Sequence, residues 1–130
     1  MTLILDTSIL INIERRDKHT IEEIENIIKS DSVPANITFV NHFEFIYGLR
    51  TKSHQNKEKS LNFIEAFHCL QTTKKTSQIL SDIKYKYDKL GKLFSLADII
   101  IASQTIENNM TLVTNDKHFA EMEELKKIII

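Results

Sequence analysis

The sequence predicts an α/β fold of one domain, in which a central parallel sheet of about five strands carries helices on both faces. Short apolar runs of strand length alternate along the chain with stretches of helical periodicity. The strand candidates are apolar throughout, as expected where both faces of a sheet are covered. No repeat, low-complexity tract or linker divides the 130 residues, so we expect a single domain over 1–130.

The first third of the sequence predicts two strand and helix units. Residues 2–5 form an apolar run that ends at Asp6, and a helix should follow. A second helix should stop near 30–31, and a strand is expected over 33–37 with Pro34 near its start. The apolar residues that mark these two helices at helical spacing are Ile9, Leu10, Ile13, Ile21, Ile24, Ile27 and Ile28.

The rest of the chain continues the alternation. Thr38 can cap the next helix, and Gly91 is a typical C-terminal cap. The stretch 95–106 is apolar nearly all round, which suits a buried helix. We expect, in order, helices at 39–50 and 61–67, a short strand at 67–70, helices at 79–90 and 95–106, a strand at 110–114, a short helix at 117–122 and a strand at 127–130.

Composition indicates an ordered protein in a reducing compartment. Hydrophobic residues make up 42% and charged residues 27%, with two glycines and one proline. The single cysteine, Cys69, cannot close a disulfide within the chain and offers no thiol pair for zinc. No segment approaches the roughly 20 apolar residues of a membrane span, and the N-terminal run has no basic leader. We therefore expect a cytoplasmic protein with no membrane partner.

Charge is unevenly distributed along the chain. The net charge is −1, yet the stretch 50–92 holds ten Lys or Arg residues against four Asp or Glu. A local cluster of this kind could bind a nucleic-acid backbone, and Arg50, Lys84 and Lys89 are our candidates for that contact. The alternative is that these residues only solvate ordinary helix faces.

Four acidic residues are notable for their positions relative to the predicted elements. Asp6 closes the first strand, Asp116 follows the fourth, and Glu44 and Asp98 interrupt apolar helices. Ligands of open parallel sheets bind beyond the carboxyl ends of the strands, so these carboxylates should converge there. Convergent carboxylates repel one another unless a cation lies between them. Because the histidines show no metal-ligand spacing, the oxygen-only set favours Mg²⁺ or Mn²⁺ over zinc.

Each of these acids also has a structural alternative, which for Glu44 is a merely solvated position on its helix. Asp6 could simply cap the helix that follows it, and Asp116 could do the same. Ser95 and Asp98 have the spacing of a capping box, with serine at the N-cap and an acid three residues later. The joint placement of the acids at one sheet edge is what favours a site.

Four segments together resemble the PIN-domain family and, within it, the VapC-type toxins of toxin–antitoxin pairs. The resemblance covers essentially the whole chain, and it depends on the order and spacing of the motifs more than on any single one. The segments are LDTSILIN at 5–12, NHFEFIYGLR at 41–50, LADIIIAS at 96–103 and LVTNDKHF at 112–119.

The resemblance implies a catalytic metal site and a function. It implies an endoribonuclease that cleaves RNA with Mg²⁺ or Mn²⁺, forms a homodimer and is inhibited by a cognate antitoxin of the VapB kind. By this resemblance, Asp6 and Asp98 are the residues we expect first to bind the metal directly. The full acidic set implied is Asp6, Glu44, Asp98 and Asp116, with supporting polar groups at Ser8, Asn12 and Thr114.

Other functions are also consistent with part of the pattern. PIN nucleases also serve RNA processing without an antitoxin, and a non-catalytic nucleic-acid-binding module could keep the fold. A haloacid-dehalogenase-like phosphatase needs Asp-x-Asp after the first strand, but Ser8 occupies the second position. A receiver domain needs adjacent acids there and a lysine near the end of its last strand, whereas Asp6 stands alone and the last strand ends in Ile130.

Overall fold

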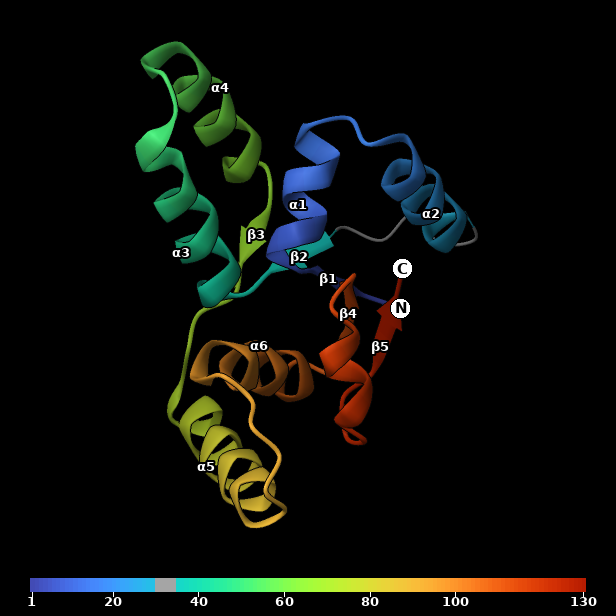
Figure 1. The fold of residues 1–130 in the computed structure, drawn as a ribbon, viewed down its shortest axis with the longest axis vertical. Helices are drawn as coiled ribbons and strands as arrows, with labels where there is room; N and C mark the ends of the chain where they lie inside the picture. Colours follow the sequence, from blue (N-terminus) through green and yellow to red (C-terminus); the bar gives the residue numbers. More distant parts are fainter. Residues whose placement is uncertain (30–34) are drawn as a thin grey trace.

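The computed structural model, which describes residues 1–29 and 35–130, is a doubly wound parallel sheet (Figure 1). Within these ranges five strands pair in the order β3-β2-β1-β4-β5, every pair parallel. The strands are β1 (Leu3–Leu5), β2 (Ala35–Ile37), β3 (His68–Cys69), β4 (Thr111–Thr114) and β5 (Lys127–Ile129). The predicted α/β class with a central parallel sheet of five strands is confirmed.

Helices connect the strands at both faces of the sheet. They are α1 (Thr7–Glu14), α2 (Lys18–Ile28), α3 (Phe39–Gly48), α4 (His54–Glu65), α5 (Lys74–Lys89) and α6 (Leu96–Glu107), with 3-10 turns η1 (Leu49–Thr51) and η2 (Lys117–Glu121). None of the helices in the described ranges has the length and apolar character needed to cross a bilayer.

Several predicted boundaries differ from the observed ones. The helix predicted at 61–67 begins earlier in the structure, at His54. Its first half is polar and shows no apolar periodicity, so the sequence pattern did not reveal it. The helix predicted at 79–90 begins at Lys74 for the same reason, and the one predicted at 39–50 ends at Gly48 in a 3-10 turn. The predicted stop near 30–31 and the first two residues of the strand predicted at 33–37 lie outside the described residues.

Three predicted helix caps are present. The Thr38 hydroxyl accepts a hydrogen bond from the Asn41 N–H at 3.1 Å, at the start of α3. The Ser95 hydroxyl does the same for the Asp98 N–H at 3.1 Å, at the start of α6. Gly91 follows α5 with a φ of 70°, a left-handed conformation that glycine adopts without steric cost.

The sheet separates two apolar cores. Leu3 and Leu5 of β1 face one core, together with residues of α1, α3 and α4. Ile4 of β1 faces the other, with residues of α5 and α6. In Figure 1, α1, α2 and α4 accordingly lie on one side of the sheet and α5 and α6 on the other. A single three-residue strand thus contributes to both cores, which explains why its sequence does not alternate.

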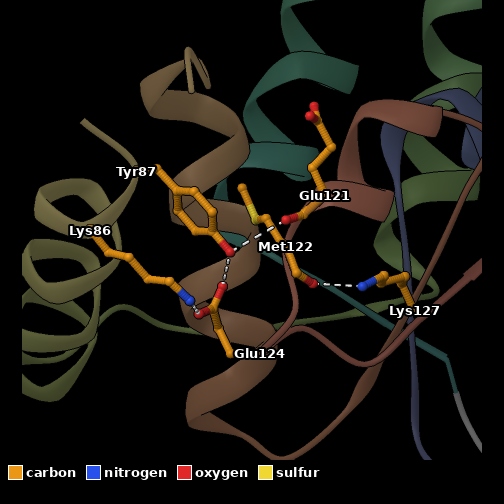
Figure 2. A network of polar contacts seen from close by, with 6 residues as sticks. All are labelled: Lys86, Tyr87, Glu121, Met122, Glu124 and Lys127. Atoms are coloured by element: carbon orange, nitrogen blue, oxygen red, sulfur yellow. Dashed lines mark hydrogen bonds and ion pairs between the residues drawn. The ribbon is translucent and has the colours of Figure 1, made fainter. Parts of the chain in front are cut away.

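A network of polar contacts (Figure 2), together with a set of aromatic ones, fixes α5 to the segment that follows β4. The buried Tyr87 donates its hydroxyl hydrogen to Glu124 Oε1, and Lys86 Nζ lies 2.8 Å from Glu124 Oε2. Tyr87 also contacts the ring of Phe94 edge-on, with centroids 5.0 Å apart, and Phe94 stacks on His118 at 4.3 Å. This network holds η2 in place beside the carboxyl edge of the sheet.

Candidate active site at the carboxyl edge of the sheet

The structure brings the four predicted acids into one cleft of about 390 Å³. Asp6 directly follows β1, and Asp116 lies two residues beyond β4. Asp98 belongs to the first turn of α6, and Glu44 to the middle of α3. The other residues that line the cleft are Thr7, Ser8, Ile101 and Asn115. Separate elements therefore present the carboxylates to a common space, as the parallel topology predicts.

Asp6 is the most buried of the four acids, with 8% of its surface exposed. Its Oδ1 accepts hydrogen bonds from the Thr7 N–H at 2.9 Å and from Asn41 Nδ2 at 3.0 Å, and its Oδ2 accepts one from Thr114 Oγ1 at 2.6 Å. Burial raises the pKa of this carboxyl above its ordinary value, the three hydrogen bonds oppose that rise, and the negative charge of Asp116 adds to it. Asp6 both caps α1 and faces the cleft.

Asp98 is half-buried and experiences the charges of its neighbours. Burial is the main cause that raises the pKa of its carboxyl, and a hydrogen bond with the Ser95 side chain opposes it. The charges of Asp116 and Asp6 raise this pKa further, while His118 lowers it. The three aspartates are therefore close enough for their charges to oppose one another, which a bound cation would relieve.

Glu44 is connected to Asp6 through Thr7 and Asn41. Thr7 Oγ1 donates a hydrogen bond of 2.6 Å to Glu44 Oε1 and accepts one of 3.1 Å from Asn41 Nδ2. No role for Thr7 or Asn41 is predicted from the sequence. The only signal in the sequence was position. Thr7 directly follows Asp6, and Asn41 precedes Glu44 by three residues, so that Asn41 and Glu44 share one side of a helix.

Of the three predicted supporting residues, Ser8 lines the cleft and Thr114 contacts one of its acids from the buried side. Thr114 bonds to Asp6, and Ser8 lines the cleft with a buried Oγ that has no hydrogen-bond partner among the described residues. Asn12 does not reach the cleft. Its Nδ2 instead donates to Thr20 Oγ1 at 3.2 Å and joins α1 to α2.

The chemistry of the cleft fits a hydrated divalent cation. In the part of the chain that the structure describes, no group of three or more His, Cys, Asp or Glu side chains is arranged to hold a metal ion by itself. Mg²⁺ is typically held by only one or two carboxylates and keeps several of its waters, so a set of oxygen donors spread around a cleft suits it. The buried, unpartnered Oγ of Ser8 is a further polar group that such a water could satisfy.

The predicted nucleic-acid contacts lie outside the cleft lining. Arg50 borders the exposed side of α3, whereas Lys84 forms an ion pair of 3.0 Å with Asp88 on α5. Lys89 Nζ lies 4.8 Å from the centroid of the Tyr85 ring. Because α4 and α5 lie on opposite sides of the sheet (Figure 1), the basic stretch 50–92 does not form one continuous surface.

The exposed side of α3 is apolar, and we call it the aromatic face. Phe39, Phe43 and Tyr47 follow one another at one-turn spacing and are 55%, 56% and 58% exposed. Together with His42, Ile46 and Arg50 they line a hollow of about 320 Å³. Exposed apolar patches of this kind usually mark an interaction surface.

The fold and cleft define an α/β domain with an acidic site at the carboxyl edge of its sheet. The chain belongs to the PIN domain family, whose model matches residues 3–125. A search of curated proteins found no significant match.

Solved structures with the same fold include VapBC assemblies. VapBC2 from Rickettsia felis, bound to a DNA fragment from its promoter, has a TM-score of 0.86 at 22% identity, covering 100% of this chain and 99% of that one. VapBC-1 from nontypeable Haemophilus influenzae has a TM-score of 0.81 at 21% identity, covering 99% and 98%. VapBC-5 from Mycobacterium tuberculosis, a member of the VapBC family of toxin–antitoxin systems, has a TM-score of 0.71 at 17% identity, covering 99% and 98%.

Proposed function

We propose that this chain is a Mg²⁺- or Mn²⁺-dependent endoribonuclease that hydrolyses RNA phosphodiester bonds, and that it is the toxin of a VapBC-type toxin–antitoxin pair. The observation that carries the proposal is the gathering of Asp6, Glu44, Asp98 and Asp116 in one cleft. Membership of the PIN domain family, whose members are generally nucleases, supports the same chemistry. The likeness in fold to VapBC assemblies supports the toxin role.

In the proposed mechanism, Asp6 and Asp98 would hold the cation, and Glu44 and Asp116 would complete the acidic set. A bound divalent ion supplies charge that activates a water and neutralises the leaving oxygen. The three hydrogen bonds to Asp6 keep its buried carboxyl oriented and favour its ionised form. The Thr7 hydroxyl donates its hydrogen bond to Oε1 of Glu44, which leaves Oε2 of Glu44 able to accept a proton from the attacking water. The exposed Asp116 is the alternative base.

We assign the aromatic face to the antitoxin. A second hollow of about 270 Å³, lined by residues of α3, η1 and α4, continues it toward Lys57. Apolar side chains on an antitoxin segment would fill these hollows, and acidic ones would pair with Arg50 and Lys57. We also propose a homodimer, and RNA backbone contacts by Arg50, Lys84 and Lys89.

A nuclease assay tests the catalytic proposal. Purified protein should cleave single-stranded or structured RNA when Mg²⁺ or Mn²⁺ is present, and cleavage should stop when EDTA removes the metal. The Asp6→Asn variant should be inactive, and a melting curve should show that it is folded. Cleavage that persists in EDTA, or that survives in Asp6→Asn, would contradict the metal mechanism.

A further inference from the structure

We infer that Asn41 is a positioning residue, whose one side-chain amide fixes both Asp6 and, through Thr7, Glu44. The inference rests on the proposed metal site and extends it to two residues that do not themselves carry charge. Asn41 is fully buried in the first turn of α3, so its amide group must find its partners inside the protein.

The orientation of the Asn41 amide follows from its neighbours. The Thr38 N–H lies 3.2 Å from Asn41 Oδ1, and the Thr38 hydroxyl lies 2.7 Å from the same oxygen. A backbone N–H can only donate, so the atom facing it must be the amide oxygen. The NH₂ group of Asn41 therefore faces Asp6 and Thr7.

Both hydrogens of that NH₂ group are used at the site. One is donated to Asp6 Oδ1 at 3.0 Å and the other to Thr7 Oγ1 at 3.1 Å. Because the Thr7 hydroxyl accepts from Asn41, its own hydrogen is directed to Glu44 Oε1 at 2.6 Å. One neutral amide thus sets the directions of two carboxylates that belong to different elements.

The alternative is that Asn41 only stabilises the start of α3. Its oxygen completes a reciprocal capping box with Thr38, and losing that box would lower stability without touching a metal site. The positioning role makes a different prediction. Groups that orient metal ligands typically contribute about 10- to 100-fold to metal affinity.

Gln104 provides a matched control. Its side chain is also a fully buried amide. Its Oε1 accepts a hydrogen bond of 3.0 Å from the N–H of Phe39, which lies in the same first turn of α3 as Asn41, and its Nε2 donates one of 3.1 Å to the Leu70 carbonyl. None of its hydrogen bonds in the described residues reaches the four carboxylates. Asn41→Leu and Gln104→Leu should therefore both lower the melting temperature of the metal-free protein.

The deciding measurement is Mn²⁺ affinity by isothermal titration calorimetry without RNA. Asn41→Leu should bind Mn²⁺ about 10- to 100-fold more weakly than wild type, and Gln104→Leu should bind it as wild type does. RNA cleavage by Asn41→Leu should recover as the Mn²⁺ concentration is raised. As a second test, Thr7→Val should bind Mn²⁺ more weakly than wild type, whereas Thr7→Ser, which keeps the hydroxyl, should bind it as wild type does.

The outcomes distinguish this inference from the proposed function. Equal Mn²⁺ affinity in wild type and Asn41→Leu would overturn the positioning role and leave the nuclease proposal standing. Weakened affinity in a protein that never cleaves RNA would support positioning and reject the nuclease. A wild type that binds no Mn²⁺ would overturn both. Should Asn41→Leu not fold, equal affinities of Thr7→Val and Thr7→Ser would overturn the connection to Glu44.

Discussion

Thr114 Oγ1 donates a hydrogen bond of 2.6 Å to Asp6 Oδ2, across 108 positions of sequence. The pairing of the strands explains this contact. Leu5 of β1 lies opposite Val113 of β4, so the residues that follow them, Asp6 and Thr114, meet at the carboxyl edge. Thr114 is fully buried, which leaves its hydroxyl no access to bulk water.

We predict that Thr114→Val destabilises the protein in a pH-dependent way. A hydrogen bond to an ionised group contributes about 1.5–3 kcal/mol, and the variant should lose about that much at pH 7. The bond holds down the pKa of Asp6 in the folded state, so its contribution is largest where Asp6 is ionised. Because burial raises the pKa of Asp6 above 3.8, the difference should shrink as pH falls through that raised value.

Urea unfolding of Thr114→Val and wild type, from pH 7 downwards, measures this. Thr114→Ser, which keeps the hydroxyl, should remain close to wild type. A difference in unfolding free energy that stays constant with pH would show that the valine does not act through Asp6, but through packing or through loss of the 3.0 Å hydrogen bond that the Asp116 N–H donates to Thr114 Oγ1.

The sequence predicted the parts of the site that lie at strand ends. Asp6 and Thr114 each close an apolar run, and parallel pairing brings such residues together without any knowledge of side-chain contacts. The contacts of Asn41 and Thr7 with the acids were missed because they are hydrogen bonds between different elements. Periodicity identifies the face of a helix, but it does not show which polar group on that face meets a neighbouring loop.

Charge density along the sequence was a weaker guide than strand position. The stretch 50–92 is basic in sequence, but the fold distributes it over both sides of the sheet (Figure 1). Several of its lysines also have partners within the protein, as Lys52 has with Glu14 and Lys86 with Glu124. A count of charges therefore does not define a binding surface.

We predict that the double reversal Lys84→Glu and Lys89→Glu weakens RNA binding. The measurement is fluorescence anisotropy of labelled single-stranded RNA in an Asp6→Asn background, which prevents cleavage. Loss of two phosphate contacts should lower the salt slope of log K by roughly 1.4, at ~0.7 for each contact. The control reverses Lys18, at the start of α2, and Lys29, which directly follows α2. Both are exposed, and their reversal should change the slope little beyond general repulsion. An equal effect of both pairs would mean that Lys84 and Lys89 are solvated surface residues that do not contact RNA.

We predict that the aromatic face binds the antitoxin. Phe43→Ser and Tyr47→Ser should each weaken binding of the proposed cognate antitoxin by about tenfold or more, since aromatic hot-spot residues contribute about 2 kcal/mol or more. Tyr85→Ser is the matched control, because Tyr85 is 63% exposed but lies on α5. Titration calorimetry measures the affinity.

Light scattering of the same variants separates the antitoxin from a second copy. Wild type should have twice the chain mass of 15.1 kDa, and the two serine variants should keep that mass. Variants that become monomeric and still bind the antitoxin would assign the aromatic face to the dimer instead.

The last prediction separates two roles for Asp98. The structure shows that Ser95 caps α6 through its own hydroxyl, while the Asp98 carboxylate lines the cleft. If Asp98 only supported the helix start, Asp98→Asn would destabilise the protein by up to about 1 kcal/mol with or without metal, and activity would largely survive.

A metal ligand at this position would behave oppositely. Burial first, and then the charges of Asp116 and Asp6, raise the pKa of Asp98. Removing its charge therefore relieves both costs, and the metal-free variant should melt at the same temperature as wild type or higher. Stabilisation by metal follows RT ln(1 + [L]/Kd), so a variant with weakened affinity should lose most of it. Melting curves in EDTA and in excess Mn²⁺, beside the RNA cleavage assay, decide between the roles. We expect Asp98→Asn to gain little stability from Mn²⁺ and to lose cleavage by orders of magnitude, whereas a variant that metal stabilises as fully as wild type and that still cleaves RNA would make Asp98 a helix cap.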